Sequence, residues 1–330
     1  MSSQVVLGVV ASHSTLMNTH WQEVESEPRA HRFRDGLKRA REAVAAAEPD
    51  VAVIVGSNHF RGFWLDLLPA FTIGVGEVVA SGESGTPKGP QRTDPGFAQA
   101  LAGAVVERDF DLAFSARMQI DHGQTHAVQY LLDGVDVPIV PLVVNVFAPP
   151  LPSMPRCLAL GHALGAAVAE LPGDRRVVVI GSGGLSHELP FPDWRAPVGE
   201  DEEFLVQAWL NGREDWQSYD PRRREIVRAA APGVNPLFDA EFLSLLEAGR
   251  SAELAQRTSA ELEAEAGNGA QEIRTWLVTA AACGHGPATT LAYEPMPEWL
   301  TGMGVALIEP AALDPAVPDF SGTKTAGATA

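Results

Sequence analysis

The sequence predicts an α/β protein, a three-layer α/β/α sandwich around a mostly parallel or mixed central sheet. The first observation is a set of short, β-branched apolar runs that do not alternate with polar residues, which is typical of strands buried on both faces. The second is that helical patterns separate these runs, as they do when helices cover a sheet. The third is the length of 330 residues, which is enough to bury a large core.

The predicted strands and helices alternate along the N-terminal part of the chain. Strands are expected at Val5–Val10, Val51–Val55, Val137–Val146 and Val177–Ile180. Helices are expected before the second, third and fourth strands, at Arg29–Ala47, Pro95–Glu107 and Arg156–Leu171. The polar segment Ser81–Thr93 is rich in glycine and proline, so we expect a loop there that covers a pocket.

After Pro190 the pattern becomes helical. Helices are predicted at Glu200–Asn211, Pro221–Ala231, Asp239–Ala248, Thr258–Ala266 and Ala270–Ala282. Thr258 and Glu261 have the spacing of a capping box, which marks the start of one of these helices. We expect residues 1–310 to form a single domain, and residues 311–330, rich in Pro, Gly, Thr and Ala, to form a flexible C-terminal tail.

The composition excludes several classes of protein. A formal net charge of −18 repels nucleic acid and anionic membrane surfaces, so neither is an expected partner. Only two cysteines are present, which excludes a disulfide scaffold and a cysteine-rich metal site. No apolar run reaches the roughly 18–20 residues of a membrane helix, and the N-terminus has no basic leader region. We therefore expect a cytoplasmic protein.

The positions of the histidines point to a site. Three of the four predicted strands run, within a few residues, into His13, His59 and His187. In open α/β sheets ligands bind beyond the carboxyl ends of the strands, so these three imidazoles are expected to converge. His122, in the loop before another helical pattern, is a fourth candidate, and His126 one turn later is undecided. The other four histidines have the ordinary interpretation of surface or capping residues: His20, His31, His162 and His285.

Two imidazoles and one carboxylate form the facial triad of non-haem Fe(II) oxygenases, and a zinc hydrolase uses the same residue types. Glu272 is the candidate carboxylate, since it lies in the first turn of a predicted helix and shares a face with the apolar Trp276. A carboxylate facing the core needs a cation or a metal. The alternative is an ordinary glutamate that favours the helix dipole, and the spacing alone leaves both open.

Five segments together resemble the class III extradiol ring-cleavage dioxygenases, the superfamily of the protocatechuate 4,5-dioxygenase beta subunit. The segments are Ala11–Ser14, Gly56–Phe60, Gln119–Gly123, Gly181–His187 and Gln271–Trp276. Within the superfamily the chain looks like the single-chain 2,3-dihydroxyphenylpropionate 1,2-dioxygenase branch, over most of its length. The resemblance implies a three-layer sandwich with one catalytic domain, and an enzyme that inserts both atoms of O2 into a substituted catechol, opening the ring next to the diol.

The resemblance also implies a role for each candidate. His13, His59 and Glu272 are expected to bind Fe(II). His187 is expected to act as a base near the substrate hydroxyl, and His122 as a second acid/base that assists ring opening. Substrate contacts are expected from four further residues: Asn58, His126, Arg61 and Arg92. The two arginines are predicted to lie in loops near the cleft and to bind a side-chain carboxylate, whereas Arg274 is expected to point away from Glu272 along the helix.

Other functions remain compatible with these residues. A 2-aminophenol could replace the catechol at the same site, and a zinc-dependent hydrolase or lyase could use the same scaffold. A non-catalytic partner subunit is argued against by the presence of all five candidate catalytic and metal-binding residues. A homo-oligomer is expected. The residues do not select the particular catechol or aminophenol, nor the position of ring cleavage relative to its side chain.

Overall fold

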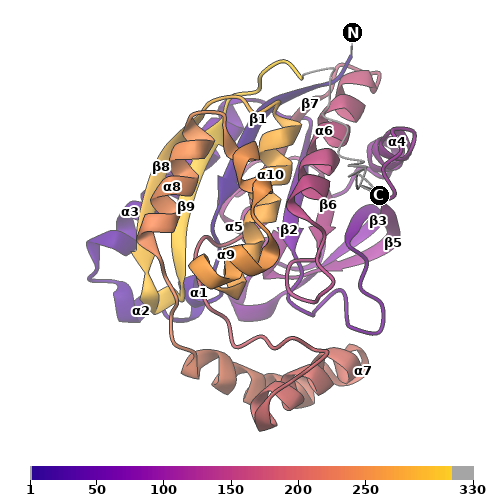
Figure 1. Ribbon diagram of the computed structural model, residues 1–330. Helices are drawn as coiled ribbons and strands as arrows, with labels where there is room; N and C mark the ends of the chain where they lie inside the picture. Colours follow the sequence, from indigo (N-terminus) through magenta and orange to yellow (C-terminus); the bar gives the residue numbers. More distant parts are fainter. Residues whose placement is uncertain (1, 314–330) are drawn as a thin grey trace, which may run out of the picture.

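A nine-stranded mixed sheet is the middle layer of the computed structural model, which describes residues 2–313 (Figure 1). The strand order is β4-β3-β6-β2-β7-β1-β9-β8, and β5 pairs with β3. Helices cover both faces, so the predicted three-layer α/β/α sandwich is confirmed. The predicted tail, residues 311–330, falls outside the described residues from position 314 onwards.

The strands of the sheet are β1 (Gln4–Ala11), β2 (Val51–Ser57), β3 (Phe71–Ser81), β4 (Lys88–Pro90), β5 (Ala113–Ile120), β6 (Ile139–Val144), β7 (Arg176–Ser182), β8 (Ala288–Met296) and β9 (Thr301–Ile308). The helices are α1 (Leu16–Thr19), α2 (Trp21–Val24), α3 (Pro28–Ala46), α4 (Pro95–Val106), α5 (His122–Leu131), α6 (Met154–Glu170), α7 (Gly199–Ala229), α8 (Pro236–Glu247), α9 (Ser259–Ala266) and α10 (Ile273–Ala282). Two short 3-10 turns, η1 (Glu83–Gly85) and η3 (Asn268–Glu272), adjoin the site described below.

The four predicted strands are confirmed as β1, β2, β6 and β7, which lie side by side and parallel in the centre of the sheet. Strand β2 shows why its sequence does not alternate with polar residues. Val51, Val53 and Val55 pack in one apolar cluster with α6, while Ala52 and Ile54 pack in another with α3. Every residue of the strand is buried, because helices cover it on both faces.

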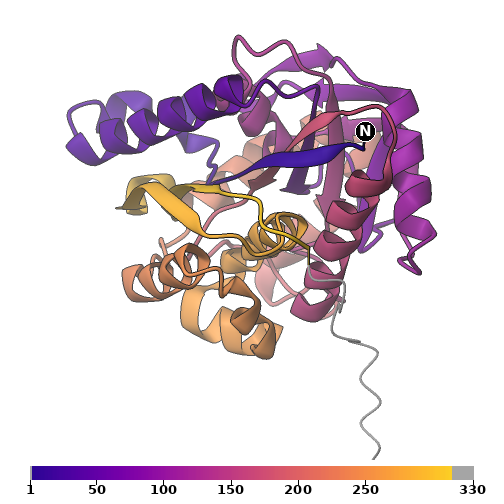
Figure 2. The same ribbon diagram turned by 90° about the horizontal axis from the view of Figure 1, so that it is seen from above.

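The two helical layers lie on opposite faces of these central strands. Helices α6 and α10 pack against β1 and β7 on one face, and α3 and α5 pack on the other. Figure 2 looks from above and separates α3 from α10 across β1. The predicted helices of this region and of the C-terminal part are confirmed within a few residues, and Thr258 and Glu261 form the predicted capping box.

Five strands lie outside the sequence prediction, namely β3, β4, β5, β8 and β9. Strand β4 and turn η1 fall within Ser81–Thr93, so this segment is not wholly a loop. The two helices predicted at Glu200–Asn211 and Pro221–Ala231 are confirmed as the two parts of α7, which are joined at a kink where Asp215 leaves helical geometry.

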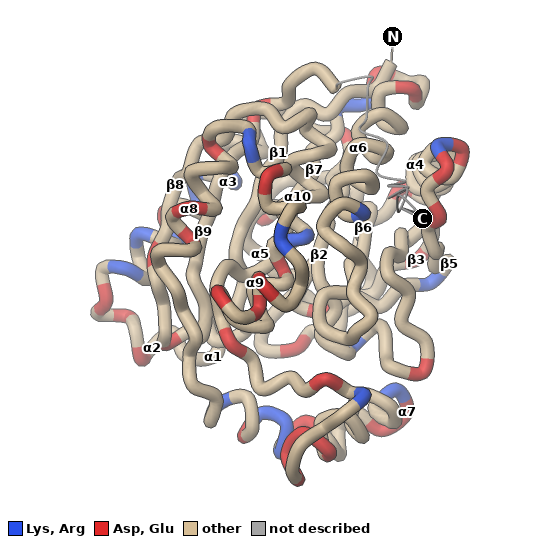
Figure 3. The backbone as a smooth tube through the Cα atoms, viewed as in Figure 1, with Lys and Arg blue, Asp and Glu red and all other residues tan. Residues whose placement is uncertain are grey.

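Helix α7 crosses beneath the carboxyl ends of the central strands, apart from the two helical layers (Figure 1). Acidic and basic residues are mixed along it (Figure 3). Within residues 2–313 there is no helix with the length and apolar character needed to cross a membrane.

Candidate active site

Two histidines and one glutamate meet beyond the carboxyl ends of the central strands. His13 follows β1, His59 follows β2, and Glu272 ends turn η3 just before α10. Both imidazole Nε2 atoms face the same carboxylate oxygen: Glu272 Oε1 lies 3.3 Å from His13 and 3.4 Å from His59. The strand register brings them together, because Ala11 of β1 and Gly56 of β2 both pair with Ser182 of β7. These three side chains are called the floor of the cavity.

The other ring nitrogen of each floor histidine has a partner. His59 Nδ1 lies 3.3 Å from Asp121 Oδ1, and the second Asp121 oxygen accepts a hydrogen bond from the His59 amide at 2.6 Å. His13 Nδ1 lies 2.9 Å from the Ser182 hydroxyl. Partners of this kind orient a metal-binding histidine and leave its Nε2 lone pair directed at the ion. His13 Nε2 has no hydrogen-bond partner among the described residues, as expected for such a ligand atom.

Glu272 is also held from outside the floor. Its Oε1 accepts a hydrogen bond from the Ser57 hydroxyl, and its Oε2 accepts one from the Gly184 amide at 2.5 Å. A Cβ atom at position 184 would lie 3.1 Å from Glu272 Oε2 and 2.8 Å from the His187 ring, so only glycine allows this close approach. The glycine-rich segment after β7 thus brings the backbone against the floor.

The electrostatics of the floor favour a cation. Burial opposes a charge on His59, yet the carboxylates of Asp121 and Glu272 outweigh it and raise the pKa of His59 to about 9. Burial likewise opposes a charge on Glu272, but His13 and His59 hold its pKa well below its usual range. Two imidazole nitrogens and one carboxylate oxygen are a donor set that suits Fe(II) or Zn(II), so the floor residues fit a bound divalent metal.

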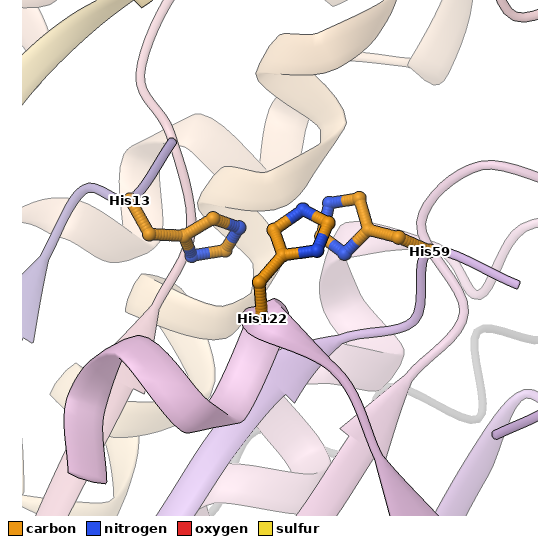
Figure 4. Close-up of side chains that lie close together, drawn as sticks. All are labelled: His13, His59 and His122. Atoms are coloured by element: carbon orange, nitrogen blue, oxygen red, sulfur yellow. The ribbon is translucent and has the colours of Figure 1, made fainter. Parts of the chain in front are cut away.

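His122 lies close to the floor histidines (Figure 4). Nitrogen atoms of His13, His59 and His122 lie within 4.8 Å of one another, so three histidines are a geometric alternative for a metal. The ring of His122 is stacked on that of His59, with centroids 3.7 Å apart and an angle of 29°. Lone pairs of stacked rings lie in nearly parallel planes and do not converge, whereas the rings of His13 and His59 meet at 77°. The geometry therefore favours Glu272 over His122 as the third ligand.

His187, in the loop after β7, has the geometry of a base. Its Nδ1 lies 2.8 Å from the Leu185 carbonyl, which only accepts, so Nδ1 carries the proton and Nε2 has the free lone pair. That Nε2 lies 3.9 Å from Glu272 Oε2, on the side of the cavity. Burial lowers the pKa of His187, which keeps the imidazole neutral and able to take a proton.

His122 begins α5 and is held by a carboxylate. Glu83 Oε1 lies 2.7 Å from His122 Nδ1 and accepts a second hydrogen bond from the His122 amide at 2.9 Å. Burial and then the charge on His59 lower the pKa of His122 to about 4, while Glu83 opposes this shift. Glu83 belongs to Ser81–Thr93, the segment expected to cover a pocket, and it does line the cavity. With a pKa of about 4 the His122 ring is neutral near pH 7, and its Glu83 partner favours a proton on Nδ1.

The floor lies at the base of a cavity. The volume of this cavity is about 920 Å³ when the solvent-filled space at its entrance is counted. The second half of α7, residues 216–229, lies across it and is called the mouth; it contributes Asp220, Arg223, Arg224, Val227 and Arg228 to the lining. His20, which the sequence favoured as an ordinary surface residue, also lines the cavity, between α1 and α2.

The structure separates the two arginines predicted to bind substrate. Arg61 lines the cavity and is buried, with its Nε 3.0 Å from Glu83 and its Nη2 3.4 Å from Asp220. Burial and then the charge on Arg223 lower the pKa of Arg61 to about 9. The prediction that Arg92 lies near the cavity is wrong. Its carbonyl accepts from the Ile139 amide at the amino end of β6, the opposite edge of the sheet, and its side chain pairs with Asp136.

Asn58, His126 and Arg274 are buried beside the floor but are not part of the cavity lining. The amide of Asn58 exchanges two hydrogen bonds with the Phe63 backbone, at 3.0 and 3.1 Å. The His126 ring lies 5.9 Å from the His13 ring, and neither of its nitrogens has a hydrogen-bond partner in the described part of the chain. Arg274 points away from Glu272, as predicted, and donates to the Pro152 carbonyl at 2.9 Å.

Comparison with known proteins identifies the class. Residues 7–304 match the family described as the catalytic LigB subunit of aromatic ring-opening dioxygenase, and the chain belongs to this family. The resemblance carried by the five segments is thereby confirmed. The chain is 35% identical over 283 residues to 2,3-dihydroxyphenylpropionate/2,3-dihydroxicinnamic acid 1,2-dioxygenase from Escherichia coli strains E24377A and K12, which covers 81% of this chain and 88% of theirs. A crystal structure of an uncharacterized protein from Escherichia coli K12 aligns with a TM-score of 0.43 and 15% identity, over 92% of this chain and 99% of that one.

Proposed function

We propose that this protein is an Fe(II)-dependent extradiol dioxygenase that opens the ring of a substituted catechol next to the diol. One observation carries the proposal: the Nε2 atoms of His13 and His59 both face Oε1 of Glu272, in a chain of the ring-opening dioxygenase family. When bound there, Fe(II) supplies the redox chemistry by which O2 reacts with an electron-rich ring. The same evidence supports residues 1–310 as one catalytic domain.

His187 removes a hydroxyl proton from the diol. Its Nε2 accepts the proton, because its Nδ1 already donates to the Leu185 carbonyl. Loss of this proton leaves the ring electron-rich, which is the state that reacts with O2. The buried position of His187 keeps its ring neutral before substrate binds, since burial lowers its pKa.

His122 supplies a proton during ring opening. Its pKa of about 4 keeps the ring neutral before substrate binds, so it first takes up a proton that the diol releases and then passes it on from Nε2, while Glu83 holds Nδ1. The different partners of the two histidines support their different roles: a neutral carbonyl behind His187 favours a base, and a carboxylate behind His122 favours an acid.

The substrate is proposed to carry a side chain. The Escherichia coli relatives are named for 2,3-dihydroxyphenylpropionate and 2,3-dihydroxicinnamic acid, both of which are catechols with a side-chain carboxylate. The cavity extends from the floor to the arginines of α7, so a ring bound at the floor would have its side chain directed toward basic residues. We also propose that the protein is cytoplasmic and forms a homo-oligomer, which cell fractionation and size-exclusion chromatography test.

Oxygen uptake tests the proposed reaction. Protein prepared without oxygen and loaded with Fe(II) is expected to consume one O2 per catechol and to form a yellow ring-opened product. A ferrous chelator should remove the activity, and Zn(II) should not restore it. Full turnover with Zn(II) alone, or no oxygen uptake with any catechol, would contradict the proposal. Faster turnover of 2-aminophenols than of catechols would change the substrate class and leave the site assignment standing.

A further inference from the structure

Arg223 is a buried cation at the mouth with few partners of its own. Its residue is 8% exposed and lines the cavity from the second half of α7. Its Nε has no hydrogen-bond partner within the described residues. Its ion pair with Asp220 is 3.8 Å long, which is too long for a hydrogen bond. The carboxylates of Glu83, Asp220 and Asp121 act on this guanidinium through space, but its ion pair with Asp220 is too long for a hydrogen bond, so it can still bind an anion that enters the cavity.

The neighbouring arginines are already engaged. Arg61 donates to the carbonyls of His59 and Phe60 and pairs with Glu83. Arg224 donates to Asp220 at 2.7 Å, and its side chain is largely exposed. Asp220 is therefore shared by other arginines and is not a dedicated partner for Arg223.

Arg61 and Arg223 also lie close to each other. The guanidinium carbons of the two residues lie 2.9 Å and 5.2 Å from the centre of the Trp216 ring. The two buried charges repel each other, and Asp220, which lies 3.4 Å from Arg61 and 3.8 Å from Arg223, offsets part of this repulsion. The local charge of the mouth thus differs from the net charge of −18 that the whole chain carries.

We infer that Arg223 binds the carboxylate at the end of the substrate's side chain and so determines the preference of this site for acidic catechols. This inference rests on the proposed function, since the ring and diol are assigned to the floor. The guanidinium offers two parallel N–H groups to a carboxylate, which gives an orientation as well as an affinity. The ligand class is a catechol with a carboxylate-terminated side chain, and Arg61 instead positions Glu83.

Two ligands that differ only in charge test the inference: 3-(2,3-dihydroxyphenyl)propanoate and its primary amide. Calorimetry measures their binding to the metal-free protein without oxygen, and steady-state kinetics with Fe(II) gives kcat/KM for each. Wild type should favour the carboxylate in both measurements, by roughly 10- to 100-fold. Arg223→Gln should reduce this ratio to about one, mainly through loss of affinity for the carboxylate.

Matched variants complete the test. Arg222→Gln removes a charge from the same helix at an exposed position outside the cavity lining, where Arg222 pairs with Asp201, and it should keep the wild-type ratio. Arg223→Lys should restore part of the ratio. Circular dichroism and the melting temperature establish that each variant is folded. Three results would overturn the inference. The ratio could stay unchanged in Arg223→Gln, or Arg223→Gln could lose the same affinity for both ligands. The ratio could also be lost only in Arg61→Gln. If no catechol is turned over, the proposed function fails, while the binding ratio still decides the role of Arg223.

Discussion

The floor and the mouth of the cavity are built in different ways. The floor residues His13, His59 and Glu272 are between 1% and 5% exposed and adjoin elements of the central core. The mouth is half of one bent helix, whose charged side chains form ion pairs with one another and with Arg61. The floor is thus positioned by strand register and packing, and the mouth by ion pairs on an added helix. Under the proposed function, the floor would hold the reacting diol and the mouth would contact the substrate's side chain.

The largest effect is expected from a floor residue. Glu272→Ala removes the carboxylate that faces both histidines, so the protein should retain no iron and show no detectable turnover. Iron content after gel filtration and oxygen uptake measure the two losses. Arg224→Ala, at the mouth, is the matched control and should keep its iron. Iron bound at full occupancy in Glu272→Ala would show that the third ligand is another residue, with His122 the first candidate.

The next effect concerns the two acid/base histidines, which lie between floor and mouth. His187→Ala and His122→Ala should retain iron yet lose roughly 10²–10⁴-fold in kcat, the usual contribution of a general acid or base. Iron content and single-turnover rates separate the two properties. If His187→Ala loses its iron, the division between ligands and acid/base residues is incorrect.

A smaller pair of effects sharpens the comparison. Asp121→Asn changes the partner of His59 and should weaken iron binding by about 10- to 100-fold, with activity recovered at high Fe(II). Glu83→Gln changes the partner of His122 and should lower kcat by about 10-fold while iron affinity stays the same. Chelator competition and kinetics measure these quantities, with Asp136→Asn at the opposite edge as the control. If Asp121→Asn and Glu83→Gln change iron affinity and kcat to the same extent, the proposed difference between the partner of His59 and the partner of His122 is wrong.

The smallest effect lies outside both regions, at His285. Burial and then the charge on His162 lower the pKa of His285 from 6.5 to about 4. Between these values the unfolded chain binds a proton that the folded chain does not, so the free energy of unfolding should fall as the pH falls from 6.5 to 4. His285→Asn, which suits the φ of 52°, should reduce this loss. Denaturant midpoints at pH 7 and pH 4.5 measure it, and exposed His31→Asn should behave as wild type.

Much of the fold and the floor could be predicted, because the relevant residues follow continuous apolar strands. Strand β2 is buried throughout, so its continuous apolar sequence clearly predicts a strand. His59 lies two residues after the end of this strand, so its position could be predicted as well. Strands β5 and β8 escaped prediction because they are partly exposed, and their sequences mix polar and apolar residues. Strand β3 carries Gly74 and Gly76, where a Cβ would meet Pro141 and the Ala116 carbonyl. Close packing therefore requires glycine at two positions where a strand usually has β-branched residues, and this weakened the strand pattern.

The mouth could not be predicted, since its partners come from distant segments. Arg61 and Arg92 have similar loop contexts in the sequence, yet they lie at opposite edges of the sheet. Arg223 is one of three consecutive arginines, and only its burial distinguishes it from Arg222 and Arg224. Glu83 lay in a segment correctly expected to adjoin a pocket, but nothing local in the sequence indicated that it would contact His122. Asp121 lies in the segment Gln119–Gly123 that contributed to the resemblance, but nothing in the sequence indicated that it would contact His59.

The position of α7 in the chain has an evolutionary consequence. Its 31 residues, from Gly199 to Ala229, form one uninterrupted stretch between β7 and α8, and no residue of the floor lies within it. Mutations can therefore accumulate in this stretch without changing the register that brings His13, His59 and Glu272 together. If α7 selects the substrate as proposed, substrate preference can change within one contiguous segment of the sequence while the floor residues stay the same.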